Sequence, residues 1–213
     1  MTELLAQAAV IVELAIGEYA PIRSAHKLEI SGWIMEYLMT DKARITRFRN
    51  GFKKAIANNF DDAFYIGYAD GGGGDRTEAD ADDNAWLAAK IQAEFGFIDM
   101  LFQNLKEFRS DPDTGPEDYQ AEAEKRAENY AKTLDGVYNQ GKTRGDKNKM
   151  LTFGGEDGDE SCATCQKYKG KRHSAKWWMK RDLLIYRGNN NYECGCYQCQ
   201  HYHYDDKGNV YTI

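Results

Sequence analysis

Apolar residues before position 141 recur every three or four residues, which is the spacing of one face of an α-helix. Interruptions in this pattern divide the region into five predicted helices. They cover residues 2–20, 24–39, 41–64, 77–109 and 116–141. In the fourth helix the apolar stripe is wider than a coiled-coil seam, so the sequence predicts a bundle of about five helices.

Proline, glycine and capping residues set the predicted helix ends. Pro21 is expected to end the first helix, because proline has no backbone N–H to continue it. Thr77 is the predicted N-cap of the fourth helix. Pro116 occupies the first position of the fifth helix, and Gly141 is expected to end it. The glycines at 71–74 predict a loop, since no Gly-Lys-Ser/Thr follows them as in a phosphate-binding loop.

The pattern changes after residue 141. Residues 142–160 are polar, charged and glycine-rich, which predicts a linker, with a short strand at 150–153. Beyond it, Asp206-Lys-Gly208 lies between alternating aromatic positions and predicts a terminal hairpin. The fold class is therefore mainly α, with a helical domain at 1–141, a linker at 142–160 and a small irregular α+β module at 161–213.

All five cysteines lie in the predicted module. Cys162 and Cys165 form a Cys-x-x-Cys pair, and a second cluster follows some thirty residues later. Two such clusters of soft ligands suit one tetrahedral zinc ion, which would act as the staple that so small a region needs. The six candidate ligands for its four positions are Cys162, Cys165, Cys194, Cys196, Cys199 and His201.

Other interpretations of the cysteines remain open. A Cys-x-x-Cys pair can be redox-active, and free cysteines are often small buried apolar residues. An odd number of cysteines fits poorly with a secreted disulfide framework. The first apolar run lacks a preceding basic segment, so we expect no signal peptide, and no run approaches the ~20 residues of a membrane span. We leave His203 out of the ligand set and expect His173 at the surface.

Charge is divided unevenly along the chain. Residues 161–213 carry nine Lys and Arg against four Asp and Glu, a charge of +5, whereas the remainder carries 19 against 30, a charge of −11. A basic, aromatic-rich module suggests contact with nucleic acid or an acidic protein surface, although lysines can also simply solubilise it. The candidate nucleic-acid-binding residues are Lys169, Lys171, Arg172, Lys176, Trp177, Trp178, Lys180 and Arg181.

Several short motifs of the module are similar to those of a known protein family. They are Cys162-x-x-Cys165, Gly170-Lys171, Trp177-Trp178-Met-Lys-Arg181, Glu193-Cys194-Gly195 and Cys199-x-His201. Residues 160–204, about a fifth of the chain, resemble the C-terminal module of minor head (head-morphogenesis) proteins of tailed bacteriophages. The resemblance implies Cys162, Cys165, Cys194 and Cys199 as zinc ligands with His201 nearby. At Cys196 the family usually has another residue.

The resemblance also implies a function. We expect a non-enzymatic virion protein that is made in the host cytoplasm and acts in head assembly at or near the portal and inner capsid. Its partners would be portal or major capsid proteins in a symmetric assembly of several copies, with packaged DNA as a further candidate. The alternative is a nucleic-acid-binding zinc-module protein.

An enzyme is the third possibility. His201, His203 and Asp205 together suggest a metal hydrolase, but a catalytic zinc ion keeps an open coordination position. The cysteines here suffice to close the site, so we expect no catalysis.

Overall fold

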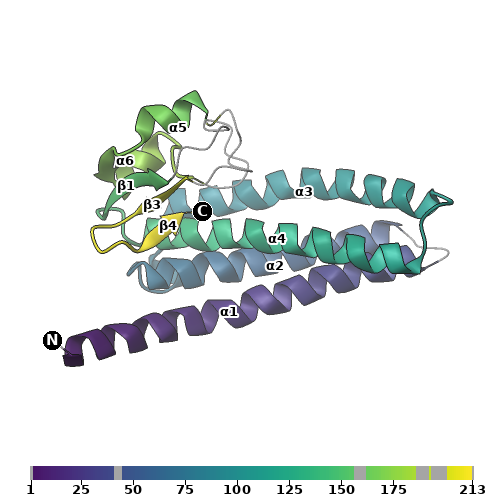
Figure 1. Cartoon of the computed structure of the whole chain (residues 1–213), viewed down its shortest axis with the longest axis horizontal. Helices are drawn as coiled ribbons and strands as arrows, with labels where there is room; N and C mark the ends of the chain where they lie inside the picture. The colour runs from purple at the N-terminus through teal and green to yellow at the C-terminus, as the bar shows by residue number, and fades with distance from the viewer. Residues whose placement is uncertain (1, 41–44, 156–161, 186–191, 193–200, 213) are drawn as a thin grey trace. The chain divides into compact units, whose positions relative to one another are not determined.

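The computed structural model describes residues 2–40, 45–155, 162–185, 192 and 201–212, with backbone only for residues 2–17 and 212. It is mainly helical, with a small antiparallel sheet of four strands (Figure 1). Two compact units form. The helical unit comprises Met1–Asp62 and Asn84–Leu134, and the sheet unit comprises Ala63–Asp83 and Asp135–Ile213. Among the described residues, none of the helices combines the length and the hydropathy of a membrane span.

Four long helices replace the five that the sequence predicts. They are α1 (Thr2–Met39), α2 (Ile45–Asp70), α3 (Ala81–Ser110) and α4 (Pro116–Gly145). The predicted break at Pro21 is wrong, because α1 continues through it. Proline removes one backbone hydrogen bond from a helix interior, and the fully buried Ile30 and Ile34 that follow belong to the packing that offsets this loss.

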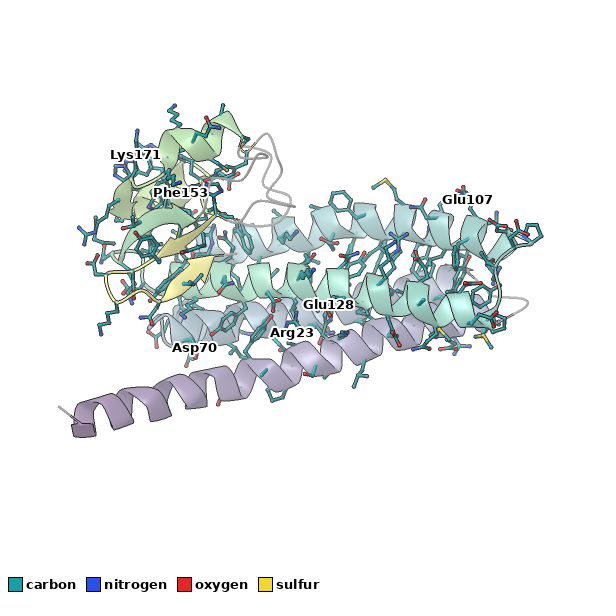
Figure 2. The ribbon with its side chains drawn as sticks, in the orientation of Figure 1. Arg23, Asp70, Glu107, Glu128, Phe153 and Lys171 are labelled. Atoms are coloured by element: carbon teal, nitrogen blue, oxygen red, sulfur yellow. The ribbon has the colours of Figure 1, made fainter. Side chains whose placement is uncertain are left out.

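The core of the helical unit is aromatic. The Phe102 ring of α3 lies edge-on to Tyr37 of α1 and Phe52 of α2, with ring centroids 5.2 and 5.7 Å apart. Phe52 in turn lies 5.2 Å from Tyr130 of α4. Edge-to-face contacts of this kind favour one packing arrangement over others. On the surface of the unit, Glu128 of α4 receives hydrogen bonds from two basic side chains of α1, one of which, Arg23, is labelled in Figure 2.

In the sheet unit, glycines let two helices approach closely. Gly67 of α2 and Gly71, which directly follows that helix, lie against the part of α4 that contains Gly141 and Gly145, and a Cβ at any of the four would collide with backbone of the opposite segment. The prediction that Gly141 ends a helix is therefore wrong. That glycine lies inside α4 because the crossing leaves no room for a side chain, and the helix continues to Gly145.

The segment before α3 differs from its predicted form. A 3-10 turn, η1 (Arg76–Glu78), follows Asp75, whose carboxylate accepts hydrogen bonds from the Thr77 amide and hydroxyl. Asp80 accepts from the amides of residues 82 and 83 at the start of α3. The prediction of Thr77 as N-cap is wrong, since Asp80 takes that place.

The strands are β1 (Met150–Gly155), β2 (Arg172–Ser174), β3 (His201–Tyr204) and β4 (Val210–Thr212), in the order β2-β1-β3-β4. Neighbouring strands are antiparallel, and β3 and β4 form the predicted hairpin. For residues 142–160 the sequence predicts a linker around a short strand. The end of α4 and all of β1 lie in this range, and residues 156–161 lie outside the described residues.

Two short helices, α5 (Ala163–Tyr168) and α6 (Ala175–Lys180), cover one face of the sheet (Figure 1). Leu151 and Phe153 of β1 point to this face and join Cys165 of α5 and Trp178 of α6 in one buried apolar cluster. The indole Nε1–H of Trp178 donates to the Leu151 carbonyl at 3.1 Å, which fixes α6 on the strand. We call this group of buried residues the Phe153 cluster (Phe153 is labelled in Figure 2).

Candidate metal centre

Cys162 and Cys165 lie on the first turn of α5. Cys162 is its N-cap residue and Cys165 is fully buried one turn later, so the helix brings their side chains together. The two Sγ atoms are 3.4 Å apart. This separation is too long for a disulfide, whose sulfurs lie about 2.05 Å apart. Two thiolates on one tetrahedral zinc ion are separated by about 3.8 Å, given Zn–S bonds of about 2.3 Å. The pair therefore fits a shared ion after a small adjustment.

Backbone hydrogen bonds tie this cysteine turn to the sheet. The Phe153 amide donates to the Lys171 carbonyl at 2.9 Å, and the Gly170 amide donates to the Phe153 carbonyl at 2.8 Å. Gly170 has φ of +73°, a conformation that glycine adopts without strain. The loop after α5 is thus fixed on β1, and the cysteine pair is positioned by the sheet rather than by α5 alone.

His201 lies on the same face of the sheet. It stands opposite Gly155 in the β1–β3 ladder and is almost fully buried. Its imidazole lies 5.3 Å, centroid to centroid, from the Phe153 ring. Cys165 belongs to the Phe153 cluster and Cys162 packs against it. The structure therefore places three of the six predicted ligands around one cluster. The other three, Cys194, Cys196 and Cys199, lie outside the described residues.

His203 has the environment of a core residue. It pairs with Phe153 across the ladder, and its ring lies 4.6 Å from that of Trp178. Burial lowers the pKa of His203 to about 3, so its imidazole is neutral at physiological pH. Sequence reasoning missed the role of Phe153, the aromatic ring that contacts both histidines of β3. The sequence predicted only that Phe153 ends a short strand at 150–153.

Asp205 has a structural role in the hairpin turn. Its carboxylate accepts hydrogen bonds from the amides of Lys207 and Asn209 at 2.9 Å and from Asn209 Nδ2 at 3.0 Å. Burial by itself would raise the pKa of Asp205, but these hydrogen bonds outweigh it and leave the pKa below its ordinary value. A carboxylate that closes a turn in this way is poorly placed to serve a hydrolase.

Most of the predicted nucleic-acid-binding residues lie at the surface of the sheet unit. The exposed basic residues are Lys169, Lys171, Arg172, Lys176, Lys180 and Arg181, and Lys171 is labelled in Figure 2. Arg172 already forms an ion pair with Asp206.

The two tryptophans differ. Trp178 is 0% exposed within the Phe153 cluster, so its inclusion among the candidate nucleic-acid-binding residues is wrong. Trp177 is half-buried, and His173 stacks on it with ring centroids 3.6 Å apart and planes 13° apart. The sequence predicts no more for His173 than a place at the surface. Their contact follows from the strand-to-helix junction at Ser174, the N-cap of α6, which the sequence did not predict.

Within the described part of the chain, no three His, Cys, Asp or Glu side chains gather closely enough to hold a metal ion. Three of the six predicted ligands fall outside that part. Of the three inside it, Cys162 and Cys165 have their sulfurs 3.4 Å apart, and the metal centre as a whole stays a prediction. No family model, curated protein or solved structure matches this chain.

Proposed function

We propose that this chain is a structural protein of a tailed-phage head, in which one zinc ion holds the sheet unit in a fixed shape for attachment at or near the portal. The observation that supports it is the Cys162–Cys165 pair, with its sulfurs 3.4 Å apart at the edge of the Phe153 cluster. Two further ligands would come from Cys194, Cys196, Cys199 and His201. The phage assignment itself depends on the resemblance of residues 160–204.

A structural ion suits the arrangement better than a catalytic one. Cys162 packs against the apolar cluster, Cys165 is buried within it, and His201 lies against its central aromatic ring. A site backed by apolar side chains and closed by thiolates offers no open coordination position for water or substrate. We therefore propose attachment, and not catalysis, as the function.

Both units would take part in attachment: the helical unit would supply the docking surface, and the zinc-held sheet unit would be a second, rigid contact. Large apolar side chains lie exposed on the helical unit: Leu28 of α1 and Phe97 and Met100 of α3 have exposed fractions of 75, 49 and 56%. Phe97 and Met100 are three residues apart and therefore share one face of α3. Exposed apolar side chains that are close together are typical of protein contact surfaces. Portal or major capsid proteins, present in several copies, are the proposed partners.

The zinc content of the purified chain tests the metal centre. We expect one zinc ion per chain by elemental analysis, and its loss in Cys162→Ser and in Cys199→Ser. The zinc loss should be accompanied by loss of the folded sheet unit, seen as faster amide exchange in β1 and β3, because binding and folding are coupled at such sites. Full zinc occupancy in both variants would refute the site.

Retention on immobilised portal or capsid protein, in the presence of nuclease, tests the attachment function. We expect the chain to be retained, and Phe97→Ser/Met100→Ser to be retained at least tenfold less. A matched control is Lys125→Ser, which changes an exposed position of α4 in the same unit. Equal retention of all three proteins would show that α3 is not the contact surface, and no retention of any would reject the proposed partners.

A further inference from the structure

A shallow cavity of about 270 Å³, open to solvent, lies between α5 and the turn that follows α6. One wall is formed by Thr164, Lys167 and Tyr168, which are three and four residues apart on one face of α5. Arg181 and Leu183 form the other wall. A liquid water molecule occupies about 30 Å³, so the cavity has room for a phosphate group together with several waters.

The cavity is positively charged. Lys167 and Arg181 line it, and none of the five lining residues is acidic. Both side chains are exposed and lie over aromatic rings, Lys167 Nζ 5.4 Å from the ring centroid of Tyr168 and the Arg181 guanidinium over Trp177. The hydroxyls of Thr164 and Tyr168 add two further hydrogen-bond donors. Four donors of this kind on opposite walls match the several acceptor oxygens of a phosphate better than a flat carboxylate.

Arg181 is held in place by the neighbouring tryptophan. Its guanidinium lies 4.1 Å from the centroid of Trp177, and its Nη1 donates to the Trp177 carbonyl at 3.4 Å. Trp177 is held in turn by the stacked ring of His173. A guanidinium positioned before a ligand arrives loses less side-chain entropy when it binds. Trp177 thus orients Arg181 and is not itself free to stack on a base.

We propose that this cavity binds a phosphate group of a nucleic-acid strand. The exposed Lys169, Lys171, Lys176 and Lys180 belong to the same unit and would contact neighbouring phosphates. The site goes beyond the proposed attachment function, and its residues Thr164, Lys167 and Tyr168 are not among the candidate metal ligands.

Fluorescence anisotropy with a labelled thymidine oligonucleotide, at low ionic strength, tests the site. We expect Lys167→Gln/Arg181→Gln to bind at least tenfold more weakly than the unmodified chain. The control Lys125→Gln/Lys207→Gln removes two exposed positive charges elsewhere and should bind within twofold. In Lys167→Gln/Arg181→Gln the slope of log affinity against log salt should fall by about 0.7, because one phosphate is no longer neutralised.

Thr164→Ala is a second variant that keeps both charges and suits the helix, and we expect it to weaken binding about threefold. Zinc content is measured on every variant, so damage to the metal centre is distinguished from damage to the phosphate site. The proposal is overturned if the unmodified chain does not bind the oligonucleotide. It is equally overturned if Lys167→Gln/Arg181→Gln binds as the control does, or if a poly-glutamate peptide competes as well as unlabelled oligonucleotide.

Discussion

Asp83 is a fully buried carboxylate in the sheet unit, and two cations neutralise it. Arg144 Nη1 lies 3.1 Å from one of its oxygens, and Lys147 Nζ lies 2.8 Å from the other. Arg144 is itself buried. Buried charges are tolerated in proteins when they are paired in this way, and removal of one partner leaves the other without compensation.

We therefore predict that Asp83→Ala destabilises the sheet unit by about 3–5 kcal/mol. The neighbouring Asp82→Ala is the control, because Asp82 is exposed and contributes only its charge near the N-terminus of α3, about 0.3–1 kcal/mol. Urea unfolding of both variants measures the difference. Equal free energies of unfolding for the two would contradict the role of the buried ion pairs.

Asp80 predicts a dependence of stability on pH. Its side-chain hydrogen bond with Lys147, together with the amides of α3, lowers the pKa of Asp80 from 3.8 to about 2. A lowered carboxylate pKa stabilises the folded state above the unfolded pKa, and this contribution is lost as pH falls towards 2. The effect is small, since more than half of the Asp80 side chain is exposed.

The variant Asp80→Asn isolates this charge, because asparagine still caps a helix. We expect the free energy of unfolding to fall less between pH 4 and pH 2 in Asp80→Asn than in the unmodified chain. Parallel pH profiles for the two proteins would show that the Asp80–Lys147 pair does not contribute.

Single residues were partly predictable from the sequence. The proximity of Cys162 and Cys165 was predictable, because their spacing alone brings the two thiols to one turn of helix. The sequence does not distinguish Trp177 from Trp178, since adjacent residues of one type give no indication of which is buried. The predicted N-cap of α3 is misplaced because Thr77 and Asp80 are both good capping residues, and the choice depends on the 3-10 turn between them.

The glycine crossing of α2 and α4 is the feature at the scale of elements that gives the sharpest test. Gly141→Ala would place a methyl group against the Phe64 carbonyl, where helix backbone cannot give way locally. We expect it to destabilise the sheet unit by about 3 kcal/mol. Gly96→Ala in α3 is the matched control, because nothing lies within 4 Å of its Cβ position. It should stabilise α3 by about 0.5–1 kcal/mol.

Thermal unfolding followed by circular dichroism separates these two outcomes by their opposite signs. A gain in stability from both alanines would mean that α2 and α4 do not cross as closely as the structure has them. Glycine ordinarily destabilises the interior of a helix. At position 141 the close approach of α2 excludes any larger residue, which explains the glycine.

Elements were predicted where the apolar pattern has a strong period. The regions of the long helices followed from it, and the β3–β4 hairpin followed from the turn residues at 206–208, whereas the short helices α5 and α6 were not predicted. Proline and glycine misled the predicted boundaries at Pro21 and Gly141, because both residues also occur inside helices when packing requires or tolerates them. A sequence pattern shows that proline and glycine disfavour helix. It does not show the tertiary packing that keeps them inside a helix.

At the scale of the whole chain, each compact unit is assembled from two separate stretches of sequence. The sequence predicted boundaries at 141 and 161, where composition changes. The units instead follow packing, so the ends of α2 and α4 belong with the sheet. The sequence predicted six metal ligands. The structure describes three of them, Cys162, Cys165 and His201, and the second cysteine cluster stays a prediction.

If zinc holds the sheet unit, removing it should unfold that unit selectively. On addition of a strong chelator we expect the amides of β1 to β4 to exchange with solvent at least tenfold faster. The amides of α1 after Pro21 and of α3 in the helical unit should keep their protection. Hydrogen exchange measured by mass spectrometry reports both at once. Unchanged exchange in β1 and β3 after complete metal removal would contradict a structural role for the ion.

The outer strands of the sheet, β2 and β4, are only three residues long each. Such short edge strands offer few unpaired backbone groups to a strand of another molecule. Short edge strands are one way in which β-proteins avoid aggregation through their sheet edges. Any partner of this sheet would therefore be contacted mainly through side chains, so single substitutions on its surface would be enough to alter such a contact.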